Sequence, residues 1–241
     1  MAGAANPVAQ AHRLRLHDFF NSSAAYRVRI ALNLKGLAWE HVGVKLRSGE
    51  QHQPGYKALN PAGLVPMLEA GDQHLTQSLA IIDHLDRLQP APLLVPAGGP
   101  ARDRVLAIAQ LIACDIHPLN NLRVLKYLVG PLALTEAQKN TWMAHWIGLG
   151  FDALEAMLFC DGDGDGDGNG HGDADADEAG WCVGTAPTLA DCCLVPQVAN
   201  ARRAGIDVAR WPRIHRIDAL ACRHPAFEAA APQRQPDFIP A

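Results

Sequence analysis

The sequence predicts a small α/β domain followed by an all-α domain. Residues 13–95 alternate between short strand-like runs and amphipathic helical segments, which is typical of a βαβ unit with parallel strands. Residues 90–100 are rich in proline and glycine and are expected to link two domains. Beyond them the strand pattern disappears and only helical periodicity remains. The expected organisation is a disordered tail at 1–12, a first domain at 13–95 and a helical domain at 96–241.

The first domain is expected to begin as strand, helix and strand. Residues 13–20 alternate in hydrophobicity and predict the first strand. Ser22 or Ser23 then stands where a helix over 26–34 needs an N-cap. Residues 39–46 alternate again and predict the second strand, so the two strands are expected to be parallel.

A hairpin and a helix are expected to complete this domain. Gly71-Asp72 is a turn signal with a short strand on either side. Pro66 interrupts the apolar run before it, so Pro66 is expected either at a strand edge or bulge, or after a cis peptide bond from Val65. Gln77 and Ser78 begin an amphipathic helix that extends to residue 88.

The second domain shows long helical segments with recognisable ends. Residues 101–128 have a helical pattern that His117-Pro118 should break or kink. Residues 135–159 predict a second long helix, and 212–222 a short one. Thr188 and Asp191 have the spacing of a capping box in front of another apolar run.

An acidic, glycine-rich segment at 161–180 interrupts the helical domain. It holds seven Asp and one Glu with no Lys or Arg, so the rest of a chain of net charge −4 carries +4. That mildly basic remainder favours small anionic ligands and gives no sign of a nucleic-acid partner. The segment is expected to be a disordered surface insertion. A calcium loop beginning at Asp167 is the alternative, but His171 breaks its pattern, so only adventitious cation binding is expected.

Cysteine spacing and hydropathy indicate the cellular compartment of the protein. The six cysteines form no C-x-x-C pair and no dense framework, so reduced thiols in the cytoplasm are expected. No stretch is expected to reach the roughly 18 apolar residues of a membrane span. The Ala-rich N-terminus lacks the basic start and apolar centre of a secretory signal.

Several motifs in order resemble the zeta class of the glutathione transferase superfamily. They are S-S-A-A-Y-R-V-R-I-A-L at 22–32, N-P-A-G-L-V-P at 60–66, Q-S-L-A-I-I at 77–82, D-I-H-P-L-N-N-L-R-V-L at 115–125 and T-L-A-D-C-C-L-V-P-Q-V-A-N-A at 188–201. The resemblance covers about 14–237 except the acidic segment. It implies a thioredoxin-like glutathione-binding domain, a helical substrate domain and a homodimer.

The resemblance also implies how glutathione is held. Val65, before a cis Pro66, is expected to pair its backbone with the cysteinyl residue of glutathione; the alternative is a purely structural turn proline. Gln77 and Ser78 are expected to bind the γ-glutamyl carboxylate, because a helix N-terminus favours an anion. Plain N-capping by Ser78 is the alternative, and both roles are compatible.

Ser22 and Ser23 are the expected catalytic residues, because a hydroxyl and a helix N-terminus both stabilise a thiolate. The family motif commonly has Cys at the third position, where this chain has Ala24, so no protein thiol acts there. Ser22 is favoured over Ser23, with simple helix capping as the alternative.

The helical domain is expected to supply further contacts. His117 and Asn120 are candidates for contacting glutathione, although a histidine beside proline is often structural. Arg123 and Arg203 are candidate clamps for substrate carboxylates, because a guanidinium matches a carboxylate with two contacts. Thr188 and Asp191 are assigned to helix capping only.

The implied reaction is a glutathione-dependent cis–trans isomerisation of a small acidic substrate, a maleyl-type diketo acid. Maleylacetoacetate in tyrosine catabolism is the first expectation, and maleylpyruvate in gentisate catabolism the alternative. A general glutathione transferase or peroxidase is a further alternative, followed by a non-catalytic binding protein on this fold. Reversible thiolate addition across the double bond needs no metal and no protein nucleophile.

Overall fold

The computed structural model describes residues 13–159 and 180–240. The expectations for the tail at 1–12 and for nearly all of the acidic segment therefore lie outside the described residues. Contacts divide the chain into a first unit, Met1–Leu94 with His224–Ala241, and a second unit, Val95–Arg223.

The first unit is built on a four-stranded sheet with the order β2-β1-β3-β4. Strand β1 (Leu14–Asp18) pairs in parallel with β2 (Trp39–Gly43), and antiparallel with β3 (Met67–Ala70). Strand β4 (Gln73–Thr76) pairs antiparallel with β3. The βαβ opening and the Gly71 hairpin are thus confirmed. The second strand is shorter than predicted because Leu46 already lies in a 3-10 turn.

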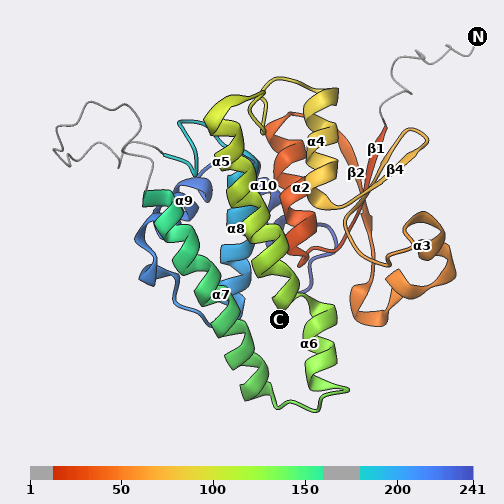
Figure 1. Ribbon diagram of the computed structural model, residues 1–241. Coiled ribbons are helices and arrows are strands. Elements are labelled where there is room, and N and C mark those ends of the chain that lie inside the picture. The colour runs from red at the N-terminus through yellow and green to blue at the C-terminus, as the bar shows by residue number, and fades with distance from the viewer. Residues whose placement is uncertain (1–12, 160–179, 241) are drawn as a thin grey trace, which may run out of the picture. The chain divides into compact units, whose positions relative to one another are not determined.

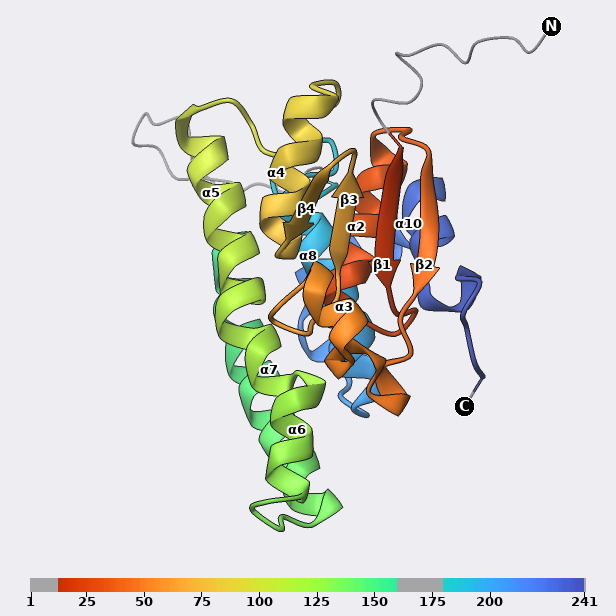
Figure 2. The same ribbon diagram turned by 90° about the vertical axis from the view of Figure 1, so that its right-hand side faces the viewer.

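Helices cover both faces of this sheet. Helices α2 (Ser23–Leu34) and α4 (Ser78–Leu88) pack together on one face, and α3 (Pro54–Leu59) lies on the other, as Figures 1 and 2 show from two directions. Leu14 and Leu16 of β1 are buried, and they alternate with Arg15 and His17 because successive strand side chains point to opposite faces. The arrangement is the expected thioredoxin-like α/β fold.

The division of the chain differs from the predicted one at the C-terminus. The prediction placed 96–241 in one helical domain, whereas His224–Ala241 belongs to the first unit. Helix α10 (Pro225–Ala230) packs on α2. Arg29 Nε donates to the Ala230 carbonyl over 2.9 Å, and Asn33 Nδ2 donates to the Ala226 carbonyl over 3.0 Å. These hydrogen bonds join residues about 200 positions apart, so local sequence patterns did not show that α10 belongs to the first unit.

The second unit is helical in its described part. Its α-helices are α5 (Gly99–Gln110), α6 (Leu122–Val129), α7 (Glu136–Phe159), α8 (Leu189–Arg203) and α9 (Pro212–Ala221). The break at His117 is confirmed, because a π-helical turn over Leu111–Ile116 passes into a 3-10 turn over His117–Asn120. Gly150 of α7 makes room for that turn, since an added Cβ would overlap the Ile116 side chain. The Thr188–Asp191 capping box is also confirmed.

One helical run has the length and composition of a membrane span, which the sequence analysis did not identify. It is Gly99–Val129, with a mean hydropathy of 1.2 in its most apolar window. Core helices of soluble proteins pass the same test, and Val105, Ile108 and Ala109 of α5 are fully buried in this unit. The turn at His117 also interrupts the run, and 33% of its most apolar window is buried.

Candidate active site

The sheet topology brings three predicted site segments to one edge. Met67, the first residue of β3, pairs with His17 near the end of β1 and with Thr76 at the end of β4. Ser22 follows β1, Val65 precedes β3 and Gln77 follows β4. The chain therefore leaves or enters the sheet at the same edge in all three places.

Ser22 is the N-cap of α2. Its Oγ accepts a hydrogen bond from the Ala25 N–H over 3.2 Å, and its backbone is extended, as an N-cap requires. Because Oγ acts here as an acceptor, the hydroxyl proton remains to be donated to another group. Ser23 is the first helical residue and is buried. Capping and stabilisation of an anion are thus compatible at Ser22, which is half-buried.

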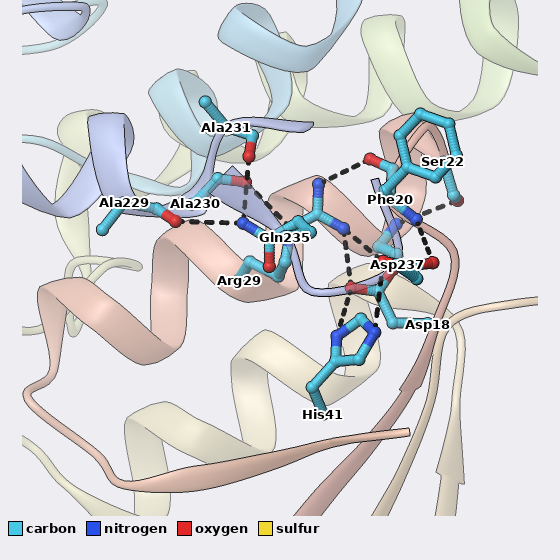
Figure 3. Close-up of polar contacts among 11 residues, drawn as sticks. Asp18, Phe20, Ser22, Arg29, His41, Ala229, Ala230, Ala231, Gln235 and Asp237 are labelled. Carbon is cyan, nitrogen blue, oxygen red and sulfur yellow. Dashed lines mark hydrogen bonds and ion pairs between the residues drawn. The ribbon is translucent and has the colours of Figure 1, made fainter. Parts of the chain in front are cut away.

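A buried ion pair supports the loop before Ser22. Arg29 Nη1 donates to both Asp18 carboxylate oxygens, over 2.8 and 2.7 Å, and both side chains are fully buried. Arg29 Nη2 also donates to the Phe20 carbonyl over 3.0 Å. Burial raises the pKa of Asp18, and the positive charge of Arg29 opposes that rise. The pair fixes the backbone that leads into α2 (Figure 3).

The peptide bond from Val65 to Pro66 is cis. Of the two predicted alternatives for Pro66, the cis peptide bond is therefore confirmed, and the position at a strand edge or bulge is not. The preceding carbonyl, that of Leu64, accepts hydrogen bonds from Tyr56 Oη and Asn60 Nδ2, each over 2.7 Å. Burial raises the pKa of Tyr56 to about 12, so the hydroxyl stays protonated and remains a donor at neutral pH. Within the described residues, the backbone of half-buried Val65 has no hydrogen-bond partner.

Gln77 is the N-cap of α4, so the alternative of plain N-capping by Ser78 is wrong. Gln77 has φ 69°, a left-handed conformation that costs a non-glycine residue about 1–3 kcal/mol. Among the described residues, its exposed side chain caps no backbone N–H of the helix. Ser78 is buried, and its Oγ accepts from Arg27 Nη1 over 3.2 Å. A helix N-terminus without a side-chain cap is suited to an anion.

The second unit brings two of its predicted site residues together through a third. Asn200 Nδ2 donates to Asn120 Oδ1, and Arg203 Nη2 donates to Asn200 Oδ1 over 3.2 Å. Asn120 is buried, and its Nδ2 donates to the Ile116 carbonyl over 2.6 Å. His117 Nε2 lies 3.3 Å from Asn121 Nδ2 within the same turn. The Asn120 amide is therefore held on both sides.

Arg123 is not part of this cluster. It is exposed on α6, and in the described part of the chain its side chain makes no hydrogen bond or ion pair. Asn200 was missed by the sequence analysis, although the i, i+3 spacing of Asn200 and Arg203 on a helix was a usable signal. Gln197, one turn earlier, is fully buried with no hydrogen-bond partner for its amide among the described residues.

Comparison with known proteins agrees with this geometry. A family model described as the N-terminal domain of glutathione S-transferase matches residues 16–93. A probable maleylacetoacetate isomerase of Vibrio cholerae is 46% identical over 227 residues, covering 93% of this chain and 98% of that protein. A solved zeta-class bacterial glutathione S-transferase, a maleylpyruvate isomerase, is 44% identical with a TM-score of 0.85 and covers 93% of this chain and 100% of its own. This chain belongs to the zeta class of the glutathione S-transferases.

A second solved member of the family carries ligands. The maleylacetoacetate isomerase of Anaeromyxobacter dehalogenans, with bound dicarboxyethyl glutathione and citrate, is 36% identical with a TM-score of 0.79, and 96% of each chain is covered. The donor set of the present first unit fits glutathione: a capping hydroxyl for sulfur, an unpaired backbone segment for a peptide and a second helix N-terminus for a carboxylate. Within the described residues, no group of three or more His, Cys, Asp or Glu is placed to hold a metal ion.

Proposed function

We propose that this chain is a glutathione-dependent cis–trans isomerase that converts maleylacetoacetate to fumarylacetoacetate. The observation that carries the proposal is the meeting of Ser22, Val65 and Gln77 at one edge of the sheet. Glutathione needs complementary groups for its sulfur, its peptide backbone and its γ-glutamyl carboxylate, and these three segments supply one each. The family membership makes glutathione the expected ligand.

Each segment of the first unit has its own proposed role. Val65 pairs its free backbone N–H and C=O with the cysteinyl backbone of glutathione, and Pro66 holds that segment in place. Gln77 and Ser78 present the N-terminus of α4 to the γ-glutamyl carboxylate. Ser22 donates its hydroxyl proton toward the sulfur while its oxygen still accepts the N–H of Ala25. Ser23, which is buried, supports the helix start.

Bound glutathione supplies a thiolate that adds reversibly to the conjugated double bond, so that the bond becomes single, rotates and is restored as trans on elimination. The chain holds the sulfur anionic at the N-terminus of α2, where Ser22 and the helix dipole lower the free energy of the charged form. It also orients the two reactants, which converts a bimolecular step into an intramolecular one.

The second unit is proposed to supply the contacts of the acidic substrate. Arg203, oriented by Asn200, neutralises a substrate carboxylate, and exposed Arg123 is the second candidate clamp. Asn120 and His117 are proposed to contact glutathione. The dicarboxylate and citrate ligands of the homologous structure support an acidic substrate.

Maleylpyruvate is the alternative substrate, because the solved relative with a TM-score of 0.85 is a maleylpyruvate isomerase. Two measurements test the proposal. The protein should be retained on immobilised glutathione and released by free glutathione. Its kcat/KM should then be measured for maleylacetoacetate and for maleylpyruvate, each with and without glutathione. Turnover of either acid without glutathione, or of neither with it, would contradict the proposal, and the larger kcat/KM identifies the natural substrate.

We further propose a homodimer located in the cytoplasm. Family membership supports the proposal of a dimer. A measured mass equal to that of the monomer, at micromolar concentration in solution, would refute it. The cytoplasm is supported by the cysteines, because Cys114, Cys182 and Cys222 form no disulfide within the described part of the chain. Fractionation of cells that produce the full chain, followed by detection of the isomerase activity, tests the location.

A further inference from the structure

The backbone of Phe20 is held on both sides by charged side chains. Its N–H donates to Asp237 Oδ2 over 3.0 Å, and its carbonyl accepts from Arg29 Nη2 over 3.0 Å. Asp237 lies 217 positions later in the chain, in the segment that follows α10. Figure 3 shows Asp237 and Arg29 approaching the Phe20 backbone from different elements. The C-terminal segment is therefore joined directly to the loop that precedes α2.

A histidine closes this arrangement into a ring of polar contacts. His41 Nε2 lies 3.2 Å from Asp237 Oδ1, and His41 Nδ1 lies 3.6 Å from Asp18 Oδ2. Both are ion-pair distances, and among the described residues neither contact has hydrogen-bond geometry. Asp18 is bound in turn by Arg29, which donates to both of its carboxylate oxygens. Starting from the Phe20 N–H, the contacts thus pass through Asp237, His41, Asp18 and Arg29 and return to the Phe20 carbonyl.

The segment that carries Asp237 is itself well anchored. Gln235 Nε2 donates to the carbonyls of Ala229 and Ala231 over 3.0 and 2.9 Å, which ties the segment to the end of α10. The ring of Phe238 meets the ring of Phe20 edge-on, with 5.4 Å between the centroids. Asp237 therefore approaches Phe20 from a fixed position.

This fixed loop ends at the residue assigned to the sulfur. The Ser22 N–H donates to the Phe19 carbonyl over 2.8 Å, so the turn from Phe19 to Ser22 is a short hydrogen-bonded unit. A displacement of the Phe20 backbone would move the Ser22 hydroxyl relative to the N-terminus of α2. Misplacement of a reacting group by about 1 Å is enough to cost roughly a hundred-fold in rate.

We propose that Asp237 is a positioning residue for the thiolate site, and that it acts through the Phe20 backbone to orient Ser22. The inference rests on the proposed function, because it assigns the sulfur to Ser22. It gives the C-terminal segment a role in positioning the residue assigned to the sulfur.

The test compares Asp237→Ala and Asp237→Asn in the full chain. Asp237→Ala removes both contacts, whereas Asp237→Asn keeps an oxygen that accepts from Phe20 and removes the charge beside His41. Arg234→Ala is the matched control, because Arg234 is exposed in the same segment and its side chain pairs, within the described part of the chain, with Glu228 alone. The readouts are kcat, the KM for glutathione, the titration of the bound glutathione thiol by thiolate absorbance, and the melting temperature.

Asp237→Ala is expected to lower kcat about ten-fold and to raise the pH at which the bound thiol titrates, with a nearly unchanged KM for glutathione. Asp237→Asn should lower kcat less than Asp237→Ala does. Arg234→Ala should have the same kcat and the same thiol titration as the parent. An unchanged thiol titration and kcat in Asp237→Ala would overturn the inference. So would a lower melting temperature with the kcat of the folded fraction unchanged. If the parent protein neither lowers the thiol pKa of bound glutathione nor isomerises the acid, that result contradicts the proposed function itself.

Discussion

Asn200 donates a hydrogen bond from its amide to Oδ1 of Asn120, 80 positions earlier in the chain. The same Asn200 accepts from Arg203 one turn further along α8. One side chain therefore sets the orientation of a buried amide and of an exposed guanidinium. Because both are proposed site residues, Asn200 links the helix that carries Arg203 to the turn that carries Asn120.

Asn200→Ala is expected to destabilise the protein by about 1–3 kcal/mol, because it leaves the buried Oδ1 of Asn120 without its donor. Urea denaturation followed by tryptophan fluorescence measures the loss. Asn140→Ala is the matched control, since Asn140 is exposed on α7. Equal stability of the two variants would show that the contact contributes nothing.

Ser22→Ala is expected to affect the chemistry more than the binding of glutathione. A hydrogen bond to a charged group is worth roughly 1.5–3 kcal/mol, which corresponds to about one to two pKa units on the thiol. The bound thiol should therefore titrate at higher pH, and turnover at neutral pH should fall about ten- to a hundred-fold and recover in part as the pH rises.

Loss of the N-cap in Ser22→Ala should also cost about 1 kcal/mol of stability, which thermal unfolding measures separately. Ser23→Ala is the comparison variant and should change the thiol titration less. If Ser22→Ala titrates and turns over like the parent, the assignment of Ser22 to the sulfur is wrong.

Tyr56→Phe is expected to weaken the binding of glutathione by a few-fold and to leave kcat nearly unchanged. The variant removes one of the two hydrogen bonds to the Leu64 carbonyl, and Asn60 still provides the other. A neutral hydrogen bond is worth about 0.5–1.5 kcal/mol, or roughly two- to ten-fold in affinity. Isothermal titration calorimetry with glutathione measures the change, and unaltered affinity would show that Tyr56 does not position Val65.

Glu69 should contribute to the loss of stability in acid. Burial raises the pKa of Glu69, but the hydrogen bond from His17 and the charge of Arg15 outweigh it and lower the pKa below its usual value. A carboxylate with a lowered pKa in the folded state stabilises the fold above its unfolded pKa of about 4.3, and this contribution disappears as the pH falls through the folded value.

Glu69→Gln should therefore be less stable than the parent at pH 7. It should lose less additional stability than the parent between pH 5 and roughly pH 3, because its amide does not titrate. Urea unfolding at a series of pH values measures both quantities. Parallel stability curves for the two proteins across this range would contradict the prediction.

Local features of both units were predictable because each depends on neighbouring residues. The Gly71 hairpin, the helix after Ser22 and the Thr188–Asp191 capping box all follow from turn chemistry or capping within a few positions. Family motifs added the cis bond before Pro66, which spacing alone left open. The alternative of N-capping by Ser78 is wrong, because α4 begins one position earlier, with Gln77 as its N-cap in a left-handed conformation.

The sequence by itself thus determined the order of the strands and of the longer helices, the two kinds of domain and the family, but not the short helices α3 and α10. Only the tertiary structure decided which distant side chains meet: Asp237 at Phe20, Asn200 at Asn120, and Arg27 at Ser78. Periodicity and capping depend on residues a few positions apart. These contacts depend instead on the tertiary packing of helices and strands that are far apart in the sequence. Asp237 illustrates the difference, since it follows α10 with no pattern that points to the loop before α2, and only the packing of α10 on α2 brings it there.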